Sequence, residues 1–166
     1  MNPDDGSPVV EDHPNPVIVQ VPEDGDLPGA GWLEAWVHAA LAGVPGEVPP
    51  GEVVVRVADE DEMAQLNGEF RGKDASTNVL SFPADLPPGP WEPALGDIVI
   101  CPPVVTREAA DQGKTLMAHW AHMVVHGTLH LLDYDHQAPE EAARMEGLER
   151  TILAGLGYGD PYHAEE

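Results

Sequence analysis

Basic residues are scarce in this chain. Seven lysines and arginines stand against thirty aspartates and glutamates, which gives a formal net charge of −23 over 166 residues. Such a charge repels phosphate backbones and anionic membrane surfaces, so on its own it argues against nucleic-acid binding. One hypothesis is a high-salt host, where the screening length falls to about 3 Å at 1 M salt and an acidic surface stays solvated. Solubility measured against salt concentration tests that hypothesis.

Cysteine and long apolar runs are also lacking. The single Cys101 excludes an internal disulfide framework and is expected to be a small buried residue. No apolar run of about 18 residues and no signal-peptide pattern is present, so we expect a cytoplasmic protein without membrane association. A hydrophobic content of 42% suits one domain with a substantial core. We expect that domain over residues 17–166, after an acidic tail over residues 1–16.

Hydrophobic periodicity predicts four strands and five helices. Strands are expected at 17–21, 52–57, 78–82 and 95–100, with a proline-rich loop at 83–93. Helices are expected at 28–44, 59–70, 102–112, 115–132 and 139–156. Asp59 should cap the second helix, and Gly113 should end the third. This mixture of elements predicts an α/β or α+β domain built on a small sheet.

The helix predicted at 115–132 is apolar around most of its circumference, so we expect it to be buried at the centre of the domain. His126 and His130 lie one helical turn apart on one face. A bend at residues 132–135 can bring His136 back to them, because aspartate tolerates left-handed conformations. Three imidazoles suit one Zn²⁺ and leave a fourth position for water or substrate. We therefore predict one zinc ion per chain, bound by His126, His130 and His136.

Two further histidines fall on the same helical face. Eight residues of helix would place His122 about 12 Å from His130, too far to share one ion. We therefore expect His119 and His122 to be core residues or to support the metal ligands from behind. Asp135 can either orient a ligand imidazole or simply terminate the helix.

The histidine spacing has the outline of a zinc-peptidase motif, in which a glutamate follows the first histidine and acts as general base. Gly127 stands at that position here. Without this carboxylate a metalloprotease-like hydrolase is the less favoured alternative. A zinc-containing assembly factor without catalytic activity is the other alternative.

The second unusual stretch is FRGKDASTNVLSF, at residues 70–82. Arg71 and Lys73 lie close together in a chain that has few basic residues. A guanidinium beside a lysine suits a phosphate clamp, and Ser76, Thr77 and Asn78 add neutral donors. The alternative is a surface turn with an exposed ion pair.

With HGTLHLLDYDH, RGKDASTNVLSF and LGDIVI in this order, the chain closely resembles the YbeY family of bacterial metal-dependent endoribonucleases, which are ribosomal RNA maturation factors. The resemblance runs from about Val53 to Tyr162 and ends with GLGYGDPY. Asp133 departs from the family pattern, which usually has glycine there. If the backbone needs a positive φ, aspartate is among the better substitutes but is strained.

The resemblance implies a small mixed sheet flanked by helices, zinc at His126, His130 and His136, and a catalytic contact of Arg71 with RNA phosphate. It also implies a zinc-dependent endoribonuclease specific for single strands, a hydrolase that cleaves phosphodiester bonds. The implied role is the maturation of ribosomal RNA 3′ ends and ribosome quality control. The implied partners are ribosomal RNA, the small ribosomal subunit, ribosomal proteins and an assembly GTPase.

Overall fold

The computed structural model describes residues 14–22, 27–72, 76–84, 93–134 and 138–162, with the side chain of Arg71 outside the description. Three predicted site residues, Lys73, Asp135 and His136, lie outside the described residues, as does most of the predicted acidic tail.

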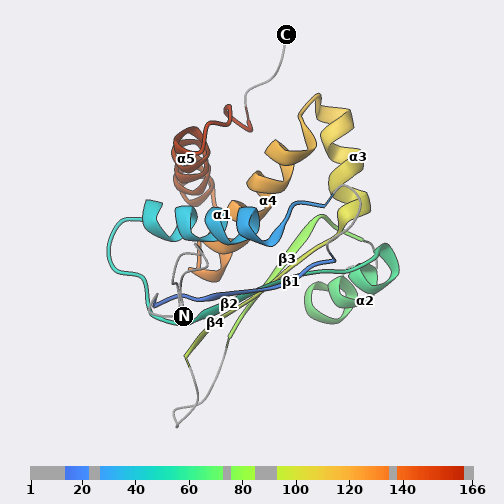
Figure 1. Cartoon of the computed structure of the whole chain (residues 1–166), viewed down its shortest axis with the longest axis horizontal. Helices are drawn as coiled ribbons and strands as arrows, with labels where there is room; N and C mark the ends of the chain where they lie inside the picture. The colour runs from blue at the N-terminus through green and yellow to red at the C-terminus, as the bar shows by residue number, and fades with distance from the viewer. Residues whose placement is uncertain (1–13, 23–26, 73–75, 85–92, 135–137, 163–166) are drawn as a thin grey trace, which may run out of the picture.

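The described chain contains four strands and five helices, in the order predicted from the sequence (Figure 1). They are β1 (Val17–Gln20), α1 (Ala30–Gly43), β2 (Glu52–Val57), α2 (Glu60–Arg71), β3 (Val79–Pro83), β4 (Ala94–Ile100), α3 (Pro102–Gln112), α4 (Leu116–Leu131) and α5 (Pro139–Gly155). The ends of two helices are determined by capping residues. Asp59 caps α2 by accepting a hydrogen bond from the Glu62 amide, and Gly113 ends α3 in a left-handed conformation, both as predicted.

The four strands form one mixed sheet in the order β1-β2-β4-β3. β1 and β4 both pair with β2 in parallel, whereas β3 pairs with β4 in antiparallel orientation. Helix α1 connects the parallel pair β1 and β2, as a crossover connection between parallel strands requires. The mixed sheet flanked by helices confirms the predicted α+β class.

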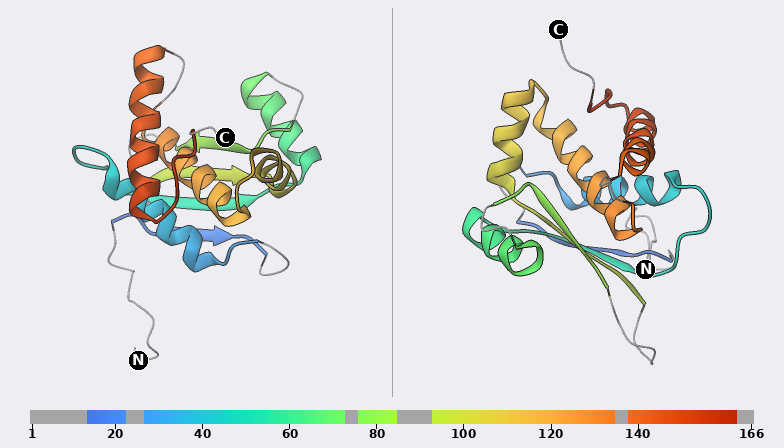
Figure 2. Two further views of the ribbon diagram at one scale, coloured as in Figure 1. Left: turned by 90° about the horizontal axis from the view of Figure 1, so that it is seen from above. Right: turned by 180° about the vertical axis from the view of Figure 1, so that it is seen from behind.

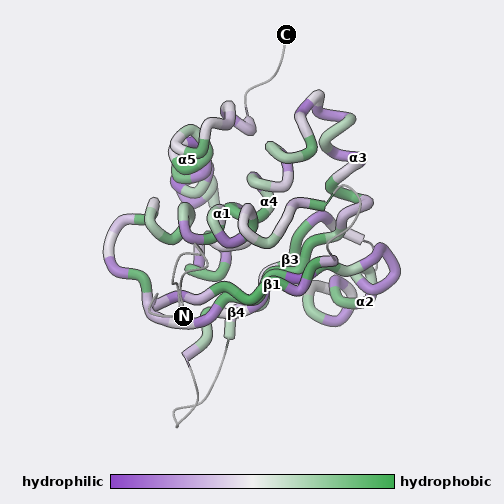
Figure 3. The backbone as a smooth tube through the Cα atoms, in the orientation of Figure 1, coloured by the Kyte–Doolittle hydropathy of each residue, from purple (hydrophilic) through white to green (hydrophobic). Residues whose placement is uncertain are grey.

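Helices cover both faces of the sheet (Figure 2). Side chains alternate along a strand, so Ile98 and Ile100 face the large core under α1 and α4, whereas Val99 faces a smaller core. Met63 from α2 is fully buried in that smaller core. Figure 3 shows hydrophobic residues along the middle of the strands, between the large and the smaller core.

Helix α4 lies at the centre of the domain, in contact with α1, α3, α5, β3 and β4. The Thr115 hydroxyl caps its first turn by accepting a hydrogen bond from the Ala118 amide at 3.1 Å. The Ser81 hydroxyl of β3 donates to the Gly127 carbonyl at 2.8 Å, which fixes the helix against the edge strand. No helix among the described residues is long and apolar enough to cross a membrane.

One apolar residue of α1 lies outside the core. The buried residues of this helix are Leu33, Trp36, Val37, Ala40 and Leu41, whereas Trp32 is 55% exposed and its ring centroid lies 6.1 Å from that of Trp36. It lies at the start of the helix, where the apolar stripe reaches the rim of the core. Cys101 is fully buried, as expected.

Gly127 lies at a close contact between α4 and the sheet, which leads to a testable prediction. A Cβ atom at this position would lie 2.8 Å from Ile98 Cγ2 and 3.2 Å from the Ser81 hydroxyl. We predict that Gly127→Ala lowers the free energy of unfolding by about 1 kcal/mol, because overpacking outweighs the gain in helix propensity. The control is Gly147→Ala in α5, whose Cβ would meet nothing within 4 Å, and which should raise stability by up to about 1 kcal/mol. Urea denaturation measures both changes, and a stabilising Gly127→Ala would contradict the prediction.

Candidate metal centre

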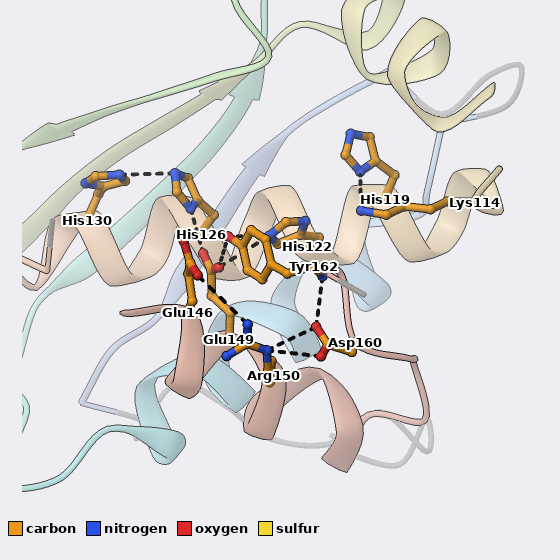
Figure 4. A network of polar contacts seen from close by, with 10 residues as sticks. All are labelled: Lys114, His119, His122, His126, His130, Glu146, Glu149, Arg150, Asp160 and Tyr162. Carbon is orange, nitrogen blue, oxygen red and sulfur yellow. Dashed lines mark hydrogen bonds and ion pairs between the residues drawn. The ribbon is translucent and has the colours of Figure 1, made fainter. Parts of the chain in front are cut away.

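A row of four histidines runs along one side of α4, at positions 119, 122, 126 and 130 (Figure 4). Their spacing of three and four residues keeps successive imidazoles on one helical face. His119 and His122 are buried, with 2% and 6% of their surface exposed, whereas His126 and His130 are half-buried. The two histidines predicted as core or supporting residues are therefore buried, and the two predicted as ligands are more accessible.

A buried carboxylate from α5 holds His126 in place. Glu149 is fully buried, and its Oε2 accepts a hydrogen bond from His126 Nδ1 at 2.6 Å (Figure 4). Its Oε1 lies 3.4 Å from His122 Nε2 and accepts the hydroxyl hydrogen of Tyr162. Because His126 Nδ1 carries the hydrogen, its Nε2 keeps the lone pair, which is the tautomer that a metal ligand needs.

The environment of Glu149 favours its ionised form. Burial alone would raise the pKa of this carboxyl group, but hydrogen bonds from His122 and His126 outweigh burial and lower the pKa to about 2. Burial lowers the pKa of His122, so its imidazole stays neutral and donates to the carboxylate. Burial and then the hydrogen bond to the Glu149 carboxylate raise the pKa of the Tyr162 hydroxyl. The cluster is therefore an anion enclosed by hydrogen-bond donors.

The segment after α5 brings Tyr162 to the cluster. Arg150 Nε contacts the two carboxylate oxygens of Asp160 at 3.2 and 3.0 Å, and Asp160 accepts from the Tyr162 amide at 2.8 Å. The Arg150 guanidinium also lies 5.5 Å from the centre of the Tyr162 ring. The GDPY sequence thus forms a turn that points the tyrosine hydroxyl at Glu149.

The second ring nitrogens of His126 and His130 face each other. Their Nε2 atoms lie 3.1 Å apart, and the two ring centroids are 4.5 Å apart. Two nitrogens bound to one tetrahedral Zn²⁺ at about 2.0 to 2.1 Å would lie roughly 3.3 Å apart. The observed pair therefore fits two ligands of one ion without rearrangement of the helix.

A second arrangement of potential ligands overlaps the first. His122, His126 and Glu149 each offer a ligand atom, and these atoms lie within 4.8 Å of one another. This group can hold a metal ion, although the metal is not identified by it. The 2.6 Å contact between His126 and Glu149 has the length of a charge-assisted hydrogen bond, shorter than the spacing of two ligands on one zinc ion.

The turn after α4 has a positive φ at the position where the family pattern usually has glycine. Asp133 adopts a φ of 72°, the left-handed conformation for which glycine or asparagine is usual. Its amide donates to the His130 carbonyl at 3.0 Å, and the Tyr134 amide donates to the Leu129 carbonyl at 3.1 Å. This pair of bonds is a Schellman motif, which ends the helix and redirects the chain just after His130. The third predicted ligand, His136, follows beyond the described residues.

A second polar cluster lies at the start of α4. Glu108 of α3 accepts hydrogen bonds from His119 Nε2 at 2.9 Å and from the Asn78 amide at 3.0 and 3.2 Å. Lys114 Nζ lies 3.5 Å from the other ring nitrogen of His119. Asn78, predicted as a neutral phosphate donor, instead uses its amide hydrogens to fix Glu108.

Paired imidazoles backed by a buried carboxylate are typical of metal-dependent hydrolases. Comparison of the sequence with known proteins gives the same class. Residues 30–157 match the family model described as Endoribonuclease YbeY. An Endoribonuclease YbeY of Alkalilimnicola ehrlichii is 58% identical over 142 residues, covering 84% of this chain and 85% of the relative. That of Xanthomonas axonopodis pv. citri is 56% identical over 143 residues, covering 84% and 87%. The chain belongs to the YbeY family.

A solved structure supports the same fold. The solution structure of TM1509 from Thermotoga maritima matches with a TM-score of 0.53 and 26% sequence identity, covering 88% of this chain and 99% of that protein. The family and the enzyme class named for its members, endoribonuclease, are those expected from the motifs.

Glu149 and Tyr162 are the site residues that sequence reasoning missed. The signal for Glu149 was present, because it falls on the stripe of Met145, Ile152 and Leu153, which are the buried apolar residues of α5. A carboxylate on such a stripe needs donors from a neighbouring element. The position of Tyr162 depends on the turn at Asp160, and no local sequence pattern relates that turn to Glu149.

The buried state of His119 generates a pH prediction. Burial is the largest cause that lowers the pKa of this imidazole below 6.5, and the hydrogen bond with Glu108 opposes it in part. Between the lowered folded pKa and the unfolded value of 6.5 the unfolded chain binds more protons, so folding stability falls as the pH drops below about 6.5. In metal-free protein, His119→Gln should reduce the slope of the free energy of unfolding against pH, by at most about 1.4 kcal/mol per pH unit. Urea denaturation from pH 7 to pH 5 measures it, and parallel curves for variant and wild type would contradict the assignment.

Proposed function

We propose that this chain is a zinc-dependent endoribonuclease that cleaves single-stranded RNA, with the ion bound by His126, His130 and His136. The observation that carries the proposal is the convergence of the His126 and His130 Nε2 atoms at 3.1 Å, while Glu149 holds the opposite nitrogen of His126. The family names of the relatives give the substrate class. We further propose a cytoplasmic role in ribosomal RNA 3′ end maturation and ribosome quality control, on the small ribosomal subunit with ribosomal proteins and an assembly GTPase as partners.

The ion is proposed to bind on the Nε2 side of the histidines rather than within the group of His122, His126 and Glu149. Glu149 is fully buried and already accepts hydrogen bonds from two imidazoles and a tyrosine. Its oxygens are therefore occupied by donors, whereas His126 and His130 are half-buried and line the accessible side of α4. In this arrangement Glu149 orients a ligand, as carboxylates behind zinc-bound histidines do.

Each residue of the site has a separate role in the proposed reaction. A bound zinc ion would supply a Lewis acid at the scissile phosphodiester. His126 and His130 would hold that ion, and Glu149 with Tyr162 keeps the His126 ring in one orientation. Arg71, which ends α2 in this fold, is proposed to neutralise negative charge that develops on the phosphate. Glu149 is an orienting group rather than a general base, because it has no exposed surface from which to reach a substrate proton.

The peptidase alternative receives no support from the position of Gly127. That residue faces Ile98, Val79 and Ser81 of the sheet, and not the face of α4 that carries the histidines. A glutamate there would be forced into the core instead of reaching a substrate, so the general base of a zinc peptidase has no place in this helix.

Glu149→Gln tests the orienting role. The amide keeps the shape of the side chain but removes the charge that accepts the His126 hydrogen, so zinc affinity should fall by about 10- to 100-fold. Competition with a chromogenic chelator measures the affinity. Glu146→Gln in the same helix is the matched control, because Glu146 contacts only Arg150 at 3.9 Å among the ion pairs of the described part. Equal zinc affinity in Glu149→Gln and wild type would argue against this role.

The catalytic proposal is tested on a single-stranded RNA with and without a chelator. Wild type should cleave only with metal, His130→Ala should lose both metal and cleavage, and Arg71→Glu should keep zinc but lose turnover. The control Arg144→Glu reverses a charge at an exposed position of α5 and should retain turnover. Equal turnover in Arg71→Glu and wild type would refute the role of Arg71. Metal content and ribosome binding without any cleavage would instead identify a non-catalytic assembly factor.

A further inference from the structure

An open pocket of about 330 Å³ lies beside the histidine row and extends beyond the proposed metal ligands. His126, His122 and Tyr162 line one part of it, and His119, Lys114 and Glu108 line another. The pocket therefore joins the candidate metal centre to the polar cluster at the start of α4.

Lys114 is held at this pocket by both its backbone and its side chain. Its amide donates to the Ala109 carbonyl at 2.9 Å, in the turn that ends α3, and the next residue caps α4. Its Nζ lies 3.5 Å from His119 Nδ1 (Figure 4), and the Nε2 atom of the same ring donates to Glu108 at 2.9 Å. The ammonium group thus lies against a buried ring that is 2% exposed.

The partner of Lys114 distinguishes it from three of the other described cations, while Arg144 is an exposed residue of α5 away from the pocket. Arg56, Arg107 and Arg150 each lie within 3.1 Å of a carboxylate oxygen, so those charges are compensated. Lys114 instead contacts an imidazole that burial keeps neutral, and the nearby Glu108 carboxylate already accepts hydrogen bonds from Asn78 and His119. An ammonium group has three hydrogens to donate, so its contact with one ring nitrogen leaves donors for a ligand in the pocket.

We propose that Lys114 binds a phosphate of the RNA strand that neighbours the phosphate being cleaved; this inference rests on the proposed function. Seven residues of α4 separate His119 from His126, which corresponds to about 10 Å along the helix axis. One phosphate cannot contact both ends of that span. The strand would therefore run along the pocket, from the metal ligands past Tyr162 to Lys114, and Lys114 would set its direction.

The test measures binding of a fluorescent single-stranded RNA by anisotropy over a salt series, with cleavage of the same RNA assayed in parallel. Loss of one phosphate contact should reduce the slope of log affinity against log salt by about 0.7. This corresponds to about fivefold weaker binding at 0.1 M salt if binding at 1 M is unchanged. Lys114→Met should show this change with unaltered zinc content, and Lys114→Arg should restore the slope. If Lys114→Met does not fold, Lys114→Gln is measured in the same way.

The matched control is Arg144→Met, which removes the same charge from an exposed position of α5 that does not line the pocket. Identical salt slopes for Lys114→Met and Arg144→Met would overturn the Lys114 contact while leaving the proposed cleavage intact. Wild type that binds RNA with the Lys114-dependent slope but does not cut it would overturn the catalytic proposal alone. Wild type that binds no RNA at any salt concentration would overturn both.

Discussion

The hydrogen bond between Glu149 and His126 connects the stability of the domain to the geometry of its site. A fully buried carboxylate is costly unless donors surround it, and here the donors come from His122 and His126 of α4 and from Tyr162. Helix α5 can pack against α4 only if these rings take the orientations that satisfy Glu149. Folding therefore fixes the tautomer and direction of His126 before any metal or substrate binds.

The opposite side of α4 is constrained just as closely. Gly127 removes a side chain where the helix meets Ile98, and Ser81 bonds to its carbonyl at 2.8 Å. The helix then ends at a turn in which Asp133 accepts a strained conformation, with φ at 72°. Because the sheet sets the depth of the helix and the turn sets where it stops, His126 and His130 keep the separation that suits one ion.

The sequence predicted what depends on local rules and missed what depends on contact between distant elements. The cap at Asp59, the end of α3 at Gly113 and the buried course of α4 all follow from residues within a few positions. The bond between His126 and Glu149 spans 23 residues, and that between His122 and Tyr162 spans 40. Periodicity could mark Glu149 as buried, yet the identity of its partner required the packing of α5 on α4.

The acidity of the chain and its membership of a ribonuclease family are reconciled by where the charges lie. At physiological salt the screening length is about 8 Å, so exposed carboxylates elsewhere on the surface act weakly on a strand held in the pocket. The local set there comprises the Lys114 cation and the carboxylates of Glu108 and Glu149, which keep their charge but whose oxygens already accept hydrogen bonds. The net charge of −23 then slows the approach of RNA more than it weakens the final contacts. A cation on a neutral support, as at Lys114, is the means by which so acidic a chain can still present positive charge to a phosphate.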